Sequence, residues 1–217
     1  MKIRSLGELQ DSLDKGLSWR LKEVSYISSN TRSAKSFAQA ALLRAGVPLI
    51  YAHWEGFVKE ASEAYLTYVA SQKLRYGELA SCFVVFGAKK YVASLIDSRR
   101  SEVNIEAVEF FRRNTVVQAD LSVSNAVNTE SNLSSTVFEN IAISLGISIA
   151  PYQAYANLID KVLLARRNKI AHGEYLDIDA SAFEQLAEEI LALLRMYKTD
   201  IENLASLQAF RNKVAAA

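Results

Sequence analysis

The chain has 217 residues, of which 50% are apolar and 23% charged, and its formal net charge is +1. A near-neutral charge argues against a strongly basic nucleic-acid coat protein, and the length suits one substantial domain, which we take to span residues 1–217. The single cysteine cannot form an intrachain disulfide, which suits a reducing compartment. Because the sequence shows neither a secretion signal nor a membrane-spanning apolar run, we expect a cytoplasmic protein without a membrane partner.

Only two prolines and eight glycines, with apolar residues at helical spacing, predict an all-α fold, an antiparallel helical bundle with long first and last helices. The first helix is expected from Leu6 to Ile27, and residues 30–33 are expected to form a turn that caps the next helix. That second helix is interrupted near Pro48, which either starts a new helix or kinks a continuous one, and it then continues to about Gln72.

Four further helices are predicted, at residues 78–96, 105–113, 133–145 and 151–172. Residues 114–132, rich in Ser, Asn, Thr and Asp, form the one long loop, which has room for a brief extended piece. Gly146 and Gly173 each follow a helix as a left-handed cap. A capping box at residues 181–184 starts the last helix, which runs to about Leu204.

Residues 166–173 (Arg-Arg-Asn-Lys-Ile-Ala-His-Gly) contain one of only two histidines in the chain. Arginine binds phosphate charge through its rigid fork of donors, and histidine moves a proton near neutral pH. Together, Arg167 and His172 could act on a phosphodiester without a metal. On an ideal helix Asn168 and His172 lie about 40° apart, whereas Arg167 and His172 lie about 140° apart. One chain therefore does not place the two side chains close together, and a second copy packed on the same face would bring an arginine of one copy beside a histidine of the other.

The same segment also has a structural interpretation. Arginine and histidine in the last turns of a helix are favoured by the negative end of the helix dipole, and a glycine after them is ordinary capping. Three arginine pairs lie at residues 99–100, 112–113 and 166–167. They would form a phosphate-binding patch if folding gathered them on one face; otherwise they are solvated or salt-bridged surface.

The segment from Arg167 to His172 resembles the signature of the HEPN superfamily, in which an arginine, usually followed by a polar residue, is separated from a histidine by four to six intervening residues. Here Asn168 is the polar residue and four residues intervene. Arg166 could equally be the motif arginine, with five intervening residues, but Asn168 directly follows Arg167. Both assignments stay open, and we prefer Arg167.

The resemblance extends upstream of the motif. Residues 51–59 (Tyr-Ala-His-Trp-Glu-Gly-Phe-Val-Lys) look like the early-helix signature of the MAE-type HEPN proteins of bacteria. Residues 132–133 (Asn-Leu) and 144–147 (Ser-Leu-Gly-Ile) are similar to the same group. The likeness spans roughly residues 50–175. The first and last helices are compatible with the same helical fold but carry no specific part of the resemblance.

The resemblance implies a helical bundle that dimerises with its two motifs across a shared cleft, and in many members a metal-independent endoribonuclease of toxin–antitoxin or phage-defence systems. Carried over, Arg167 and His172 are the catalytic pair and Asn168 supports them. His172 would act on the 2′-hydroxyl as base or on the leaving oxygen as acid, while Arg167 stabilises charge on the phosphate. The implied partners are RNA and a second copy of the chain, with an antitoxin protein as a further candidate.

Three other residues are candidates for supporting roles. Arg166 and Lys169 could bind RNA phosphate. Glu55, unusual in an apolar helix, either orients His172 or an arginine near the cleft, or forms a half-buried salt bridge. The histidines and the cysteine show no zinc spacing and no phosphate-cradling glycine loop is present, so we expect no metal and no cofactor. The alternative hypotheses are a non-catalytic RNA- or nucleotide-binding module and a structural dimerisation protein.

Overall fold

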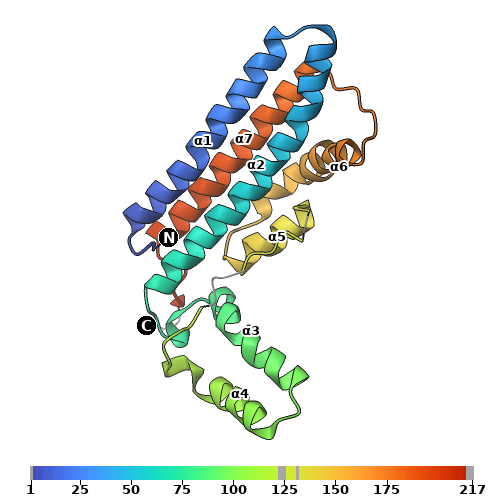
Figure 1. Ribbon diagram of the computed structural model, residues 1–217. Helices are drawn as coiled ribbons and strands as arrows, with labels where there is room; N and C mark the ends of the chain where they lie inside the picture. Colours follow the sequence, from blue (N-terminus) through green and yellow to red (C-terminus); the bar gives the residue numbers. More distant parts are fainter. Residues whose placement is uncertain (1, 122–125, 131, 214–217) are drawn as a thin grey trace.

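Three long helices lie side by side in the computed structural model, which describes residues 2–121, 126–130 and 132–213 (Figure 1). They are α1 (Leu6–Ser33), α2 (Ser36–Ser71) and α7 (Ala180–Ser206). The shorter elements are η1 (Tyr76–Glu78), α3 (Ser81–Asp97), α4 (Ser101–Arg113), η2 (Asn114–Val116), α5 (Ser135–Ser144), η3 (Ala150–Tyr155), η4 (Leu158–Leu164) and α6 (Ala165–Ala171). The predicted all-α bundle with long first and last helices is confirmed.

The three long helices do not all alternate in direction. Two ion pairs show that α1 and α7 are antiparallel: Asp14 binds Lys198 at 2.8 Å, and Arg32 binds Glu184 at 3.1 Å at the other end. Figure 1 shows α1 antiparallel to α2 as well, so α2 and α7 run in the same direction. The intervening elements therefore leave the bundle at the end of α2 and return the chain to the end where α2 began.

Of the two alternatives for Pro48, the start of a new helix is wrong, because Pro48 lies inside a single helix, α2, that also runs through Gly46. Pro48 cannot donate one intrahelical hydrogen bond, but its neighbours Val47 and Ile50 are fully buried, and this burial outweighs the local loss. Gly46 allows α7 to approach closely, since a Cβ at this position would lie 2.5 Å from the ring of Phe183. Tertiary packing thus keeps α2 continuous where local preference favours a break.

Two predicted helix starts and ends are shifted for related reasons. α1 continues through the turn predicted at residues 30–33, because Thr31 is buried and its hydroxyl donates to a carbonyl of the preceding turn. α7 begins before the capping box predicted at residues 181–184. The carboxylate of Asp179 is the cap, and it accepts the N–H of Ala182 at 3.1 Å.

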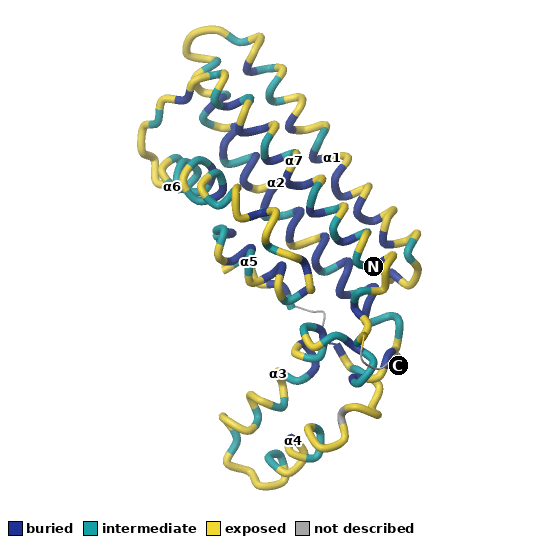
Figure 2. Tube along the Cα trace, turned by 180° about the vertical axis from the view of Figure 1, so that it is seen from behind, coloured by how far each residue is buried: buried dark blue, intermediate teal, exposed yellow. Residues whose placement is uncertain are grey.

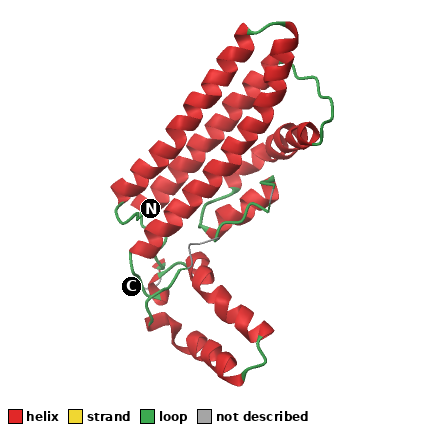
Figure 3. Ribbon diagram, viewed as in Figure 1, coloured by secondary structure: helices red, strands yellow, loops and turns green. Residues whose placement is uncertain are grey.

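α3 and α4 form a hairpin that extends beyond the end of the bundle (Figure 3), and much of its surface is exposed (Figure 2). Its two helices meet where Tyr91 stacks on Phe110, with ring centroids 3.9 Å apart. The predicted extended piece is an isolated antiparallel bridge between Gln118 and Arg75; residues 122–125 and 131 of the predicted loop lie outside the described residues. Among the described helices, none is long and apolar enough to cross a membrane.

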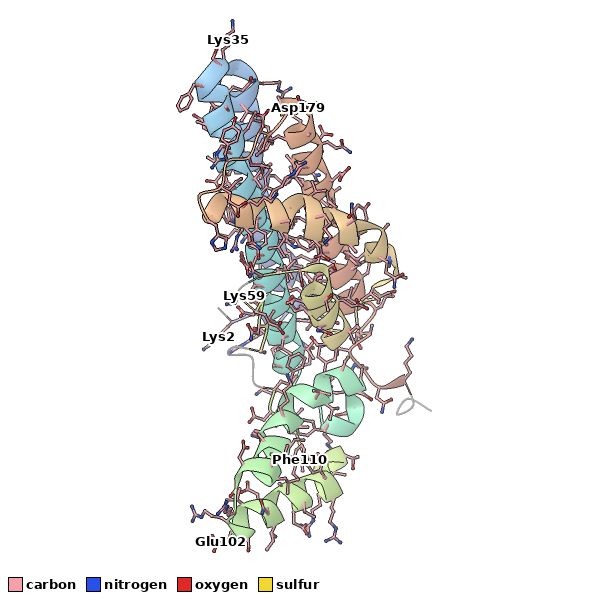
Figure 4. The ribbon with its side chains drawn as sticks, turned by 90° about the vertical axis from the view of Figure 1, so that its right-hand side faces the viewer. Lys2, Lys35, Lys59, Glu102, Phe110 and Asp179 are labelled. Atoms are coloured by element: carbon pink, nitrogen blue, oxygen red, sulfur yellow. The ribbon has the colours of Figure 1, made fainter. Side chains whose placement is uncertain are left out.

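The hairpin also separates the arginine pairs. Figure 4 places Glu102 and Phe110 of α4 at the opposite end of the molecule from Lys35 and Asp179. The pair at residues 112–113 binds Glu109 of its own helix. The three pairs are therefore not gathered on one face, and only the pair on α6 belongs to the candidate site.

Candidate functional site

The helical run before the motif is not the uniform α-helix predicted for residues 151–172. It begins as the 3₁₀ segment η3 and becomes a π-helix in η4, where the N–H of Ala165 donates to the carbonyl of Asp160, five residues back. The run becomes α-helical again only in α6. A π turn holds one residue more than an α turn, so it rotates the following side chains by about 100° relative to a straight helix. Angles between side chains are therefore meaningful only within α6.

The chain that leads into α5, residues 132–135, is bound both to this helical run and to α2; we call it the strap. The carboxylate of Asp160 accepts the N–H of Ser135 at 2.7 Å and its hydroxyl at 2.5 Å, and so caps α5 from outside. The buried N–H of Leu133 donates to the phenol oxygen of Tyr51 on α2 at 2.6 Å. These contacts join α2, α5 and the π-helix beside the motif. In Figure 4 the helical run that carries the motif crosses α2 between the levels of the labelled Asp179 and Lys59.

The guanidinium of Arg167 is positioned by uncharged partners. Its Nη1 donates to Oδ1 of Asn132 in the strap at 2.8 Å and to Oδ1 of Asn168 at 2.7 Å. Its Cζ lies 4.4 Å from the centroid of the Tyr51 ring, a cation–π contact. No described carboxylate forms an ion pair with Arg167. The positive charge is therefore fixed in direction but not neutralised, and the donors on Nε and Nη2 remain for another group.

Glu55 lies one helical turn along α2 from Tyr51 and is half-buried. Burial raises the pKa of Tyr51, and the nearby Glu55 carboxylate raises it as well, while the Leu133 N–H and the charge of Arg167 lower it. The half-buried salt bridge considered for Glu55 is not found with any described residue. Glu55 and Arg167 thus both lie near Tyr51, and Glu55 forms no hydrogen bond or ion pair with His172.

His172 is the C-cap residue that follows α6, and it is exposed. Its backbone N–H donates to the carbonyl of Asn168 at 3.0 Å, and Gly173 follows in the left-handed region with φ +78°, as predicted. The imidazole forms no hydrogen bond or ion pair with a residue that the structure describes. Because Arg167 packs on α2 and His172 faces solvent, one chain does not bring the two side chains into contact.

The remaining motif cations are less tightly held. Arg166 is half-buried, and its buried Nη1 has no hydrogen-bond partner among the described residues. An unpaired buried donor is costly, and the phosphate-binding role of Arg166 stays a prediction. Lys169 is exposed and is not ion-paired within the described part of the chain. Together with Arg167 they make α6 a locally positive helix in a chain of net charge +1.

The sequence model of one HEPN family, described as RiboL-PSP-HEPN, matches residues 15–203. The chain belongs to this family. The match includes most of α1, all of α2 and the motif, so the resemblance to the HEPN superfamily is confirmed, while the MAE-type subfamily is not. No curated protein and no solved structure matches the chain significantly. Membership in a HEPN family indicates an RNase-type or nucleotide-binding function in general terms.

Sequence reasoning missed several residues of this HEPN site. Tyr51 and Asn132 belong to the segments that carried the resemblance, but they received no role, although a tyrosine and an asparagine in such segments were a usable signal. Asp160 and the π-helix around it left no signal, because they depend on the position of α5. Among the described residues, no group of three or more His, Cys, Asp or Glu side chains could bind a metal ion.

Proposed function

We propose that this HEPN protein is a metal-independent endoribonuclease in which Arg167 and His172 are the catalytic pair. The observation that carries the proposal is the environment of Arg167. Asn132, Asn168 and Tyr51 orient the guanidinium without cancelling its charge. Preorganised charge of this kind stabilises the charge that develops on a phosphate during reaction. An arginine with only a structural role would more often be paired with a carboxylate.

The chemistry follows from these two side chains. Arg167 binds the non-bridging oxygens of the scissile phosphate through its free donors. The imidazole of His172 removes the proton of the adjacent 2′-hydroxyl, and the 2′-oxygen bonds to phosphorus while the bond to the 5′-oxygen breaks. The leaving 5′-oxygen takes up a proton from solvent water, and the imidazolium of His172 returns its proton to solvent. The products are a 2′,3′-cyclic phosphate and a 5′-hydroxyl, and no step requires a metal ion.

The complete site, in this proposal, forms between two copies of the chain. Arg167 packs against Tyr51 while His172 is exposed at the C-cap of α6, so His172 of a second copy would act on the phosphate bound by Arg167. Mixing the Arg167→Ala and His172→Ala proteins tests this. If each site combines the two chains, a mixed dimer has one intact site, and an equal mixture should recover about one quarter of wild-type activity. No recovery in mixed dimers of verified composition would contradict a shared site.

The catalytic proposal is tested by incubating purified proteins with total RNA and tRNA in EDTA and analysing the new RNA ends. Wild type should cleave, His172→Ala should not, and Arg167→Lys should be slower by roughly 10²- to 10³-fold, as when one donor to a reacting oxyanion is removed. Lys161→Ala, which removes an exposed cation from the same helical run, is the matched control and should cleave normally. Cleavage by His172→Ala, or complete loss of wild-type cleavage in EDTA, would contradict the proposal.

We also propose that the enzyme acts as a toxin or phage-defence effector, for which an antitoxin protein is the implied partner. Expression of the wild type in bacteria should then arrest growth, and His172→Ala should not. Salt-sensitive RNA binding without cleavage would instead identify a non-catalytic RNA-binding module.

A further inference from the structure

An exposed aromatic ring is fixed beside the motif. Tyr175 follows His172 by three residues and is 82% exposed. Arg44 on α2 holds this segment in place, because its Nη1 donates to the carbonyl of Glu174 at 3.0 Å. The Cζ of Arg44 also lies 5.7 Å from the centroid of the Tyr175 ring. One part of the ring thus contacts a cation, and most of its surface is open to solvent.

Phe37 extends this arrangement along α2. Residues 37, 44 and 51 are seven apart, so they lie on one face of the helix, each about 20° from the next and about 10.5 Å further along the axis. Tyr51 contacts Arg167, Arg44 contacts Tyr175, and Phe37 is 86% exposed. The face of α2 that carries α6 therefore presents the cation of Arg44 and then the exposed ring of Phe37 in a row that leads away from the motif, where Tyr51 is buried.

Rings this exposed, beside a fixed guanidinium, match the way proteins bind single-stranded nucleic acid, in which bases stack on aromatic side chains and cations contact the backbone. We propose that Tyr175, Arg44 and Phe37 form a binding track for single-stranded RNA. Tyr175 stacks on the base next to the scissile phosphate, and Phe37 on a base further along. The inference rests on the proposed ribonuclease function and specifies its substrate as unpaired RNA, since bases within a duplex do not expose their faces.

The charges around Tyr175 indicate how this part of the surface would bind RNA. Glu174 and Asp177 are exposed acidic neighbours that repel phosphate, so the Tyr175 ring would bind RNA by stacking on a base and not through the phosphate backbone. Loss of the ring should weaken RNA binding without changing its dependence on salt, because the number of phosphate contacts is unchanged.

The test measures the binding of a fluorescein-labelled, unpaired oligoribonucleotide by fluorescence anisotropy, in the His172→Ala protein so that the RNA stays intact. Adding Tyr175→Ala should weaken binding by about 5- to 150-fold, the effect of losing one stacked base, whereas Tyr175→Phe should bind as tightly as the parent. An abasic oligomer of equal length should bind the parent and Tyr175→Ala equally. Tyr26→Ala removes a ring that is 72% exposed on the outer side of α1 and serves as the matched control.

Equal binding of intact RNA by the parent and by Tyr175→Ala would overturn the track. An equal loss with intact and abasic RNA would also overturn it, because stacking would not be the cause. A change of oligomeric state in Tyr175→Ala without a change in RNA affinity would assign the surface to a protein partner instead.

The track and the proposed catalysis can fail separately. If wild type does not cleave RNA but binds it in a Tyr175-dependent way, the ribonuclease proposal fails and the track stands. If cleavage requires His172 but Tyr175→Ala leaves both KM and kcat unchanged, the ribonuclease stands and the track fails. The expected result in the active protein is a raised KM with a smaller change in kcat.

Discussion

Tyr51→Phe removes one oxygen from the site and leaves the ring beneath Arg167. The lost oxygen is the acceptor for the N–H of Leu133, at 2.6 Å in a fully buried position. A buried donor without an acceptor costs about 1–3 kcal/mol, and this is the expected loss in the free energy of unfolding. The lost hydrogen bond is one that holds the strap against α2. In a larger share of molecules the strap should therefore be displaced, and its residue Asn132 should then no longer bind Arg167. Since a displacement of about 1 Å can cost on the order of 10²-fold in rate, RNA cleavage should fall steeply.

The stability loss is measured by urea unfolding followed by far-UV circular dichroism, and activity by cleavage of an unpaired RNA. Tyr65→Phe is the matched control. Tyr65 is also a fully buried tyrosine of α2, but its hydroxyl has no hydrogen-bond partner among the described residues, so its removal should be neutral or stabilising. Asn132→Ala separates the two effects, because it frees Arg167 but leaves the Leu133 N–H paired.

Equal stability of Tyr51→Phe and Tyr65→Phe would refute the reasoning about the strap, because the Leu133 hydrogen bond would then contribute nothing. A loss of stability with undiminished cleavage would show that the strap stabilises the fold without positioning Arg167.

Two further predictions concern the bundle. Gly46→Ala should lower the free energy of unfolding by about 1–3 kcal/mol, because its Cβ would overlap the Phe183 ring, and adding Phe183→Leu should recover part of this; unchanged urea unfolding would refute the overlap. Burial lowers the pKa of His53, against the raising effect of Glu23, whose Oε2 lies 2.9 Å from Nε2 without hydrogen-bond geometry. The folded protein therefore binds a proton at His53 less readily than the unfolded chain does, and stability should decline as pH falls below the unfolded pKa of about 6.5; if His53→Gln shows the same decline, another group is responsible.

Most helices could be predicted from the spacing of apolar residues and from the two glycine caps, because these signals act within a turn or two of the chain. The errors fall where packing competes with local preference. Pro48 stands inside α2 because its neighbours are buried, and Thr31 lies within α1 for the same reason. The π-helix before the motif was not predictable, since Asp160 binds a residue of α5 that is 25 positions away in sequence.

The candidate site divides in the same way. The arginine, asparagine and histidine of the motif were visible as a short pattern, together with the 140° that separates Arg167 from His172 on a helix. This pattern and the resemblance of residues 51–59 were enough to indicate the HEPN superfamily. They did not predict that Glu55 and Arg167 both lie beside Tyr51, or that the exposed ring of Tyr175 contacts Arg44.

By itself, the sequence determined most of the helices, the left-handed cap at Gly173 and the residue types of the motif. Only the tertiary structure decided that Arg167 is oriented by Asn132 and Tyr51 and is left without a counter-charge among the described residues. The physical reason is one of range. Helical periodicity and capping depend on neighbours along the chain, whereas the environment of a charge depends on groups that folding brings from 35 or more residues away.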